Sequence, residues 1–274
     1  DTDSNGLYRY LEKAYDITGR GNIDAALDIH AATHAFNEVQ DYIKKLVWDG
    51  IPRLDTLFID YLGAEDDPVG YTRAVCRKAF TAAVARAMDP GCKYDCMLIL
   101  CGAQGLGKST ILDKMSRGWF NDSIRTFEGK EASELLQGVW LVEVAELDAF
   151  RRTDVARIKQ FLSLRADRYR AAYGRNVKEL PRCCVFFGTC NQMDFLQDTT
   201  GNRRFWPVDV GEQAHTKNVW QDLTPETVDQ IWAEAKMRWM MGEQLYLTGE
   251  VEKEAQNRQE SHREASPREG LIHE

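Results

Sequence analysis

A glycine-bearing loop between an apolar run and a helical pattern is the clearest chemical feature of this sequence. The run from Met97 to Cys101 is followed by Gly102, four residues, and then Gly107, Lys108 and Ser109, which is the phosphate-loop spacing. Glycines let backbone N–H groups converge on phosphate oxygens, and the helix start adds its positive end. Lys108 would neutralise the β- and γ-phosphates, and the Ser109 hydroxyl would ligate Mg²⁺. The predicted ligands are therefore ATP and Mg²⁺, and the predicted nucleotide-binding residues are Gly102, Ala103, Gln104, Gly105, Leu106, Gly107, Lys108, Ser109 and Thr110.

Two glutamates follow the next apolar run. Residues 139–142 read as a short strand, Glu143 stands near its end, and Glu146 comes three residues later. A phosphate-loop ATPase needs one carboxylate on the Mg²⁺ side and one that polarises the attacking water. The candidate Mg²⁺ residues are Ser109, Glu143 and Glu146. Of the two glutamates we favour Glu146 as the base and Glu143 as the metal-side acid; the reverse assignment stays open, as does a strand end with two solvated acids.

Polar residues also close a third apolar run. Asn191 ends the stretch 183–191, where it could orient the attacking water or contact the γ-phosphate, or simply cap a turn. Arg203 and Arg204 follow on a turn that the apolar residues 205–207 should hold rigid. Paired arginines on a rigid turn suit a γ-phosphate, and we expect them to reach the nucleotide of a neighbouring subunit.

Residues 151–182 concentrate positive charge in a chain of net charge −8. They hold ten Lys or Arg against three Asp or Glu, and Tyr169 and Tyr173 lie among the arginines. Cations interleaved with stackable rings are typical of grooves that bind single-stranded nucleic acid. A solvated basic surface with two packing tyrosines is the alternative. The overall acidity excludes a generally basic, histone-like binder.

Length and composition limit the number of domains and the kinds of protein that this sequence can encode. The 274 residues, 43% of them hydrophobic, suffice for one large domain or two small ones. No apolar run approaches the roughly 20 residues that span a bilayer, so we expect a cytoplasmic protein without membrane contact. Since the chain begins at Asp1, we expect a fragment of a longer protein. The seven cysteines lack paired zinc spacings and are expected as reduced, mostly buried thiols, with a metal site as the alternative.

Periodicity divides the chain into three predicted regions. Residues 1–90 show apolar positions at helical spacing, and residues 91–211 hold the strands and motifs of an ATPase core. Residues 212–274 return to helical periodicity, with a charged, linker-like tail from about residue 250. The predicted fold class is therefore α/β with helical regions on both sides of the core.

Six stretches, taken in order, resemble the virulence-associated protein E family. They are WDGIPRLDTLFIDYLGAED, PGCKYDCMLILCGAQGLGKST, LVEVAEL, KQFLSLRADRYRAAYGRN, FFGTCN and TGNRRFWPV, covering about residues 45–210. That family looks like the helicase half of phage, plasmid and poxvirus-type primase-helicases, within superfamily 3 and the wider AAA+ class. The resemblance implies a three-layer phosphate-loop NTPase core with a mostly parallel sheet. It also implies a homo-oligomeric ring, expected as a hexamer, with DNA (single-stranded or forked) in its pore and an upstream primase domain as an associated partner.

The resemblance also assigns roles residue by residue. Lys108 and Ser109 match the nucleotide and Mg²⁺ ligands, Asn191 matches the sensor, and Glu143 and Glu146 match the acidic motif. Cys190 departs from the family, which more often has Thr there. The finger candidates are Arg203 and Arg204, and the residues expected near the DNA pore are Lys159, Arg168, Arg170, Tyr173 and Arg175.

These observations predict an ATP-dependent DNA helicase or translocase module of a phage or mobile element, acting in DNA replication. One alternative is an AAA+ initiator or remodelling ATPase that grips DNA without unwinding it. Another is a protein that uses ATP only as a conformational switch. A small-molecule kinase would also contain a phosphate loop, but that function would not explain the basic segment 151–182 or the TGNRRF stretch.

Overall fold

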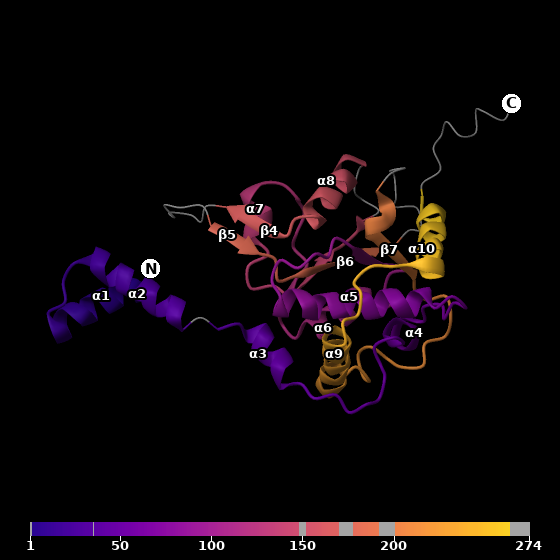
Figure 1. The fold of residues 1–274 in the computed structure, drawn as a ribbon, viewed down its shortest axis with the longest axis horizontal. Coiled ribbons are helices and arrows are strands. Elements are labelled where there is room, and N and C mark those ends of the chain that lie inside the picture. Colours follow the sequence, from indigo (N-terminus) through magenta and orange to yellow (C-terminus); the bar gives the residue numbers. More distant parts are fainter. Residues whose placement is uncertain (1, 35, 148–151, 170–177, 192–200, 264–274) are drawn as a thin grey trace. The chain divides into compact units, whose positions relative to one another are not determined.

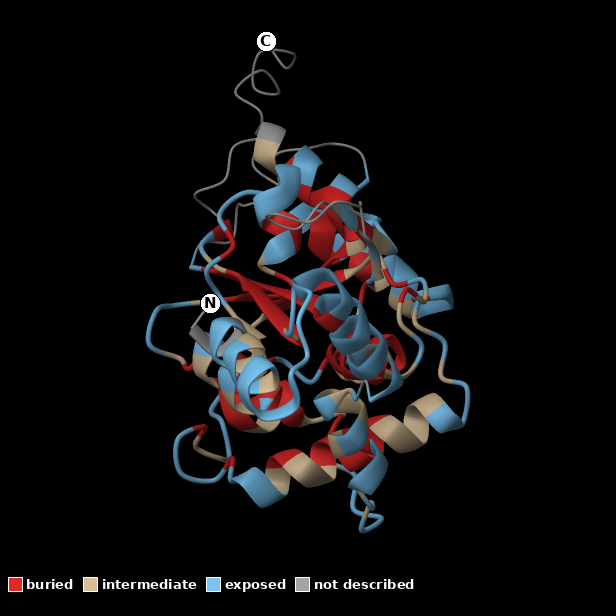
Figure 2. Cartoon of the chain, turned by 90° about the vertical axis from the view of Figure 1, so that its left-hand side faces the viewer, coloured by how far each residue is buried: buried red, intermediate tan, exposed pale blue. Residues whose placement is uncertain are grey.

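A five-stranded parallel sheet lies at the centre of residues 42–274 (Figure 1). Its strand order is β2-β3-β6-β1-β7, and all four neighbouring pairs are parallel. The strands are β1 (Met97–Cys101), β2 (Phe120–Asn121), β3 (Leu141–Val144), β6 (Val185–Cys190) and β7 (Phe205–Asp209). Strands β1, β3 and β6 are buried along their whole length, as Figure 2 shows, which is why their sequences are nearly continuous apolar runs. The predicted α/β class is confirmed.

The computed structural model describes residues 2–34, 36–147, 152–169, 178–191 and 201–263. The contacts divide the chain into two units, residues 1–41 and 42–274. The first unit contains α1 (Thr2–Tyr15) and α2 (Arg20–Thr33), and α3 (Glu38–Lys45) crosses the division. The three-region division at residues 90 and 211 stays a prediction.

Helices cover both faces of the sheet. The helices of the second unit after α3 are α4 (Leu57–Leu62), α5 (Tyr71–Met88), α6 (Lys108–Ser116), α7 (Gly129–Glu134), α8 (Arg152–Leu162), α9 (Pro225–Met240) and α10 (Gly249–Ser261). A two-stranded antiparallel hairpin, β4 (Ala166–Tyr169) and β5 (Lys178–Pro181), follows α8, and a 3₁₀ turn, η2 (Asn202–Arg204), precedes β7.

Alternate residues of each strand face opposite helical layers. Met97 and Ile99 of β1 join a buried cluster with Ala132 of α7 and with Ile158 and Phe161 of α8. On the other side lie α5 and α9, as Figure 1 shows. The result is the three-layer arrangement that the family resemblance implies.

Aromatic rings fill the layer beneath α5 and α9. The Phe80 ring of α5 lies 5.3 Å from Phe187 of β6 and 5.3 Å from Trp232 of α9. Trp140 stacks on Trp232 at 4.0 Å, and both indoles are fully buried. Each indole N–H is satisfied by a carbonyl oxygen: Trp140 donates to Ala83 (2.9 Å) and Trp232 to Met115 (2.7 Å). These bonds remove the cost of burying two polar groups in the core.

The segment from residue 249 to 261 differs from the linker-like tail that its composition predicts. It forms α10, which packs on β7. Gln259 donates to the Phe205 carbonyl (2.8 Å), and the His262 imidazole lies 2.9 Å from the Asp209 carboxylate. Arg258, one of the charged residues that suggest a solvated tail, is instead only 8% exposed and donates to Glu254 within α10 and to Glu65 far away in the sequence. Local composition does not contain these long-range partners.

The same contact groups three side chains that could ligate a metal. Atoms of Cys101, Asp209 and His262 lie within 4.8 Å of one another. The Arg258 guanidinium is 3.9 Å from the Asp209 carboxylate and 3.1 Å from Glu65, so positive charge already faces this carboxylate. We therefore interpret the group as an ion-paired joint between α10 and β7.

Truncating the stacked indole should weaken the whole second unit. We expect Trp232→Ala to lower the free energy of unfolding by about 3–5 kcal/mol, because it empties a large buried volume and leaves the Trp140 ring without its stack. Met240→Ala changes an exposed side chain on the same helix and should stay within about 0.5 kcal/mol of the wild type. Urea unfolding followed by circular dichroism measures both. Equal effects of the two variants would contradict this description of the core.

Candidate functional site

The phosphate loop connects β1 to α6, and two of its glycines are required by the backbone. A Cβ on Gly102, whose φ is 155°, would lie 2.5 Å from the Val210 carbonyl oxygen. Gly107 precedes the first residue of α6 with φ 89°, a left-handed conformation that residues with side chains rarely adopt. The N–H groups of the first turn of α6 therefore follow directly after the loop, as an anion site requires.

Lys108 is held above the loop by oxygen acceptors. Its Nζ donates to the carbonyls of Gly102 (2.5 Å) and Ala103 (2.8 Å) and to Oδ1 of Asn191 (3.1 Å). Asn191 reaches this position because β6 lies beside β1, with Cys190 in register with Cys101. The structure thus brings together the lysine and the asparagine that sequence motifs predict separately.

Glu143 is buried, with 1% of its surface exposed, and it joins α6 to two strands. Its Oε1 accepts hydrogen bonds from the Ser109 hydroxyl of α6 (2.6 Å) and the Thr189 hydroxyl of β6 (2.7 Å). A carboxylate and two hydroxyls are hard oxygen donors of the kind that Mg²⁺ prefers, so these residues fit the ion that the phosphate loop implies. This geometry supports Glu143 as the metal-side acid.

Glu146 occupies a different environment, two residues beyond the end of β3. It is exposed and has a φ of 55°, which costs a non-glycine residue about 1 kcal/mol or more. It lines a cavity of about 290 Å³ together with Lys108, Ser109 and Asn191. A strained, solvent-accessible carboxylate beside the predicted phosphate site is suited to the role of base.

Trp220 lines the same cavity and is absent from the residues that the sequence predicts. It lies in the segment between β7 and α9, with 56% of its surface exposed, and its ring packs against Gly107. No motif or periodic pattern marks this position. Only the tertiary contact between this segment and the phosphate loop reveals it.

Arg203 and Arg204 lie at the opposite edge of the sheet from the loop. They precede β7, whose first residue, Phe205, pairs with Met97 at the start of β1, whereas the loop follows Cys101. Parallel strands of five residues separate these two edges by roughly 13 Å or more. The two arginines are therefore not part of the cavity that this chain's own phosphate loop lines.

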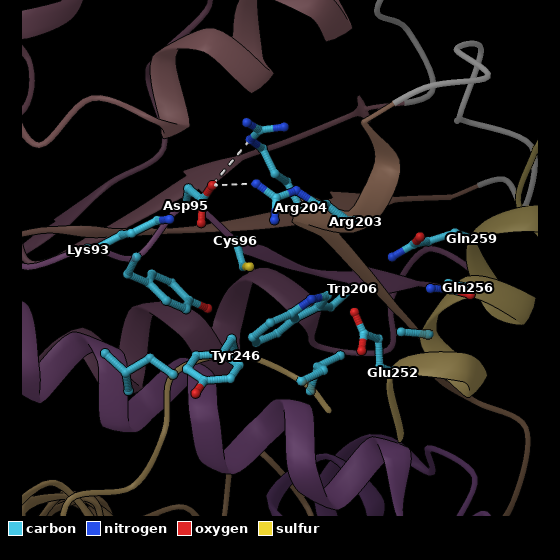
Figure 3. A pocket seen from close by; sticks show the side chains of 14 residues that line it. Lys93, Asp95, Cys96, Arg203, Arg204, Trp206, Tyr246, Glu252, Gln256 and Gln259 are labelled. Atoms are coloured by element: carbon cyan, nitrogen blue, oxygen red, sulfur yellow. Dashed lines mark ion pairs between the residues drawn. The ribbon is translucent and has the colours of Figure 1, made fainter. Parts of the chain in front are cut away.

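Asp95 holds both arginines beside a second cavity of about 360 Å³ (Figure 3). Its Oδ2 is 3.6 Å from the Arg203 guanidinium and 3.5 Å from that of Arg204. Arg204 also donates to the Ser163 hydroxyl (3.1 Å). Burial raises the pKa of the neighbouring Cys96 thiol to about 12, with Asp95 adding to the rise and the arginines opposing it, so this thiol stays protonated at neutral pH.

The residues expected near DNA lie in three different settings. Lys159 is buried, and its Nζ donates to Asn202 (2.9 Å) in the arginine turn. Arg168 of β4 is 73% exposed and bonds Glu179 across the hairpin at 2.8 Å. Arg170, Tyr173 and Arg175 lie outside the described residues. Their roles stay predictions.

The cysteines all lie within the described parts of the chain. All seven cysteines are free thiols, four of them buried. Burial raises the pKa of the Cys101 thiol, which lies at the end of β1, well above its ordinary value.

Among the helices that the structure describes, none is long and apolar enough to cross a membrane.

Comparisons with known proteins support the fold described above. The sequence profile of the Virulence-associated protein E-like domain matches residues 43–264. An apo structure of the NrS-1 C-terminal region (305–718) is similar with a TM-score of 0.51 and 15% identity, over 78% of this chain and 53% of that one. The A form apo structure of the same region gives 0.50 and 13%, over 81% and 52%. This chain spans about half the length of those structures, and at such identities the likeness concerns the fold alone. No curated protein matches the sequence.

Removing the lysine of the loop tests the nucleotide site. We expect Lys108→Ala to lower ATP turnover on the order of 100-fold or more, because the charge that would face the β- and γ-phosphates is lost. Lys253→Ala removes an exposed lysine from α10 and should leave turnover unchanged. Steady-state phosphate release measures both variants. Wild-type turnover in Lys108→Ala would refute the assignment of this loop.

Proposed function

Since the chain belongs to the Virulence-associated protein E-like domain family, we propose that it is an ATP-hydrolysing, DNA-translocating helicase module of a phage or mobile element that acts in DNA replication. The observation that carries this proposal is the convergence of Lys108, Asn191 and Ser109 on one cavity, with the Ser109 hydroxyl bonded to the buried Glu143 behind it. Each of them follows or lies near the carboxyl end of a parallel strand, which is where open α/β sheets bind ligands.

Most of the groups needed for in-line attack of water on the γ-phosphate come from the chain that holds the nucleotide. Glu146, accessible and beside the cavity, would polarise the water, while Asn191 orients it or contacts the γ-phosphate. Lys108 would exchange its bonds to the loop carbonyls for bonds to phosphate oxygens. Ser109 and Glu143 would hold Mg²⁺, which when bound neutralises charge on the β- and γ-phosphates.

An arginine from a second copy of the chain would complete this site. Arg203 and Arg204 lie at the ends of the strands remote from their own loop, which supports a role at a nucleotide held by a neighbour. Repeating this contact from copy to copy is heterologous association, which closes into a ring when the rotation permits. The arrangement supports the expected homo-oligomeric ring, with the hexamer as its proposed size.

The hairpin of β4 and β5 is the proposed DNA contact. It carries Arg168 at its exposed edge, and the connection between its strands holds Arg170, Tyr173 and Arg175. Exposed arginines contact the phosphate backbone, and a tyrosine among them offers a base a stacking surface. Lys159, buried against the arginine turn, would support that turn rather than touch DNA in the conformation described.

ATPase activity measured with and without single-stranded DNA, across protein concentrations, tests the proposal. We expect DNA to stimulate hydrolysis, and we expect the rate per chain to rise with concentration because sites form between copies. Arg204→Ala and Lys108→Ala should each be inactive alone. Mixed in equal amounts, they should recover roughly a quarter of wild-type activity, because random assembly pairs an intact loop with an intact arginine in that fraction of interfaces.

Other outcomes of this experiment distinguish the alternatives. ATP binding without turnover under any condition would favour the ATP-gated switch. Stimulated turnover without strand displacement on a forked substrate would favour the initiator or remodelling ATPase. Mixed variants without recovery would contradict the shared site.

The exposed arginine of the hairpin tests the DNA contact separately. Arg168→Ala should weaken binding to single-stranded DNA and reduce the slope of log affinity against log salt by about 0.7, because one phosphate contact is lost. Fluorescence anisotropy at several salt concentrations measures this. Lys253→Ala, which removes an equal charge from α10, is the matched control. The same affinity and slope in both variants would exclude Arg168 from the interface.

A further inference from the structure

The indole of Trp220 stands beside the cradle that would hold the phosphates. A Cβ placed on Gly107 would lie 3.3 and 3.5 Å from two carbons of the six-membered part of the Trp220 ring, so the ring rests on the loop where α6 begins. Trp220 lines the cavity that also contains Lys108, Glu146 and Asn191. More than half of this large aromatic surface, 56%, is exposed.

We infer that Trp220 is the surface on which the nucleobase stacks, and that the site therefore prefers purine over pyrimidine nucleoside triphosphates. This inference rests on the proposed function, because it concerns the same nucleotide. A base is joined to its phosphates through one ribose, so it must lie next to the cradle, and Trp220 offers an exposed aromatic face there. A two-ring purine covers more of an indole than a one-ring pyrimidine does.

The segment that carries Trp220 is fixed in place before any ligand arrives. Lys114 of α6 donates to the carbonyls of Val219 (2.8 Å), Trp220 (3.0 Å) and Leu223 (3.2 Å). The Asn218 side chain accepts from the backbone N–H groups of Trp220 (2.9 Å) and Gln221 (3.1 Å). Val219, the neighbour of Trp220, is buried.

These bonds anchor the backbone on both sides of an exposed ring. A stacking residue on an anchored backbone loses little conformational freedom when its ligand binds. The arrangement also connects Trp220 to α6, the helix whose first turn faces the phosphates. Base and phosphates would therefore contact one rigid unit.

Binding measurements with ligands that differ only in the base test this inference. We would measure dissociation constants of ATP, GTP, CTP and inorganic tripolyphosphate, each with Mg²⁺, by competition against a fluorescent nucleotide. For Trp220→Ala we expect ATP and GTP affinity to fall about 10-fold or more, CTP affinity to fall less, and tripolyphosphate affinity to stay within about twofold. Trp220→Phe, which keeps an aromatic face, should recover most of the purine affinity.

Tyr246→Ala is a matched control, since Tyr246 is also 56% exposed but lines the cavity beside the arginine turn. Equal loss of ATP and tripolyphosphate affinity in Trp220→Ala would mean that the indole only shapes the loop, and would overturn the inference. Unchanged ATP affinity would overturn it as well. Because binding does not require hydrolysis, a wild-type protein that binds purines through Trp220 without turnover would contradict the proposed function and leave this inference standing.

Discussion

The buried carboxylate of Glu143 is the interaction on which the arrangement of the site depends. A charged group with almost no exposed surface is stable only when its oxygens accept hydrogen bonds, and here two hydroxyls supply them to the same oxygen. One hydroxyl belongs to the first turn of α6 and the other to β6, so the carboxylate of β3 determines how these three elements meet. The phosphate loop, which enters α6, is positioned through the same contact.

The parallel register of the sheet separates two kinds of chemistry. Because β1, β6 and β7 run in the same direction, the groups that would bind and cleave a nucleotide gather at the carboxyl ends of strands, and the paired arginines before β7 lie at the amino ends. One chain therefore carries its phosphate loop and its paired arginines at opposite ends of the same strands. The proposed ring is built on this polarity, since an arginine of one copy would complete the site at the loop of the next.

Short stretches of the sequence predict much of this architecture, because each predicted strand and the motif residues that follow it are adjacent in the chain. The apolar run that forms β1, the strand that carries Glu143 and the strand that precedes Asn191 are each visible in fewer than fifteen residues, and the expected α/β class is confirmed. Trp220 is not predictable in this way, since its position depends on a segment after β7 that returns to α6.

The prediction of a linker-like tail at α10 is wrong for a related reason. The sequence of α10 is highly charged, as in a solvated tail, but Gln259 and His262 contact β7, whose residues lie more than fifty positions earlier in the chain. Contacts across such distances are a property of the fold and cannot be detected in a short stretch of sequence.

The roles of individual site residues also depend on which side chains contact each other. Glu143 and Glu146 are therefore hard to distinguish by their spacing in the sequence and easier to distinguish by burial, since Glu143 is buried and Glu146 is exposed.

The three oxygen acceptors around Lys108 also bear on which anions the loop would select. The ammonium donates to two carbonyl oxygens and one amide oxygen of the same molecule, and these oxygens compete for it with any incoming anion. An incoming anion must offer the lysine more than those neutral oxygens do. A single phosphate brings few charged oxygens, whereas a polyphosphate chain brings several and also meets the amides of α6. In the proposed function, the loop would therefore bind a triphosphate at concentrations at which it leaves inorganic phosphate unbound.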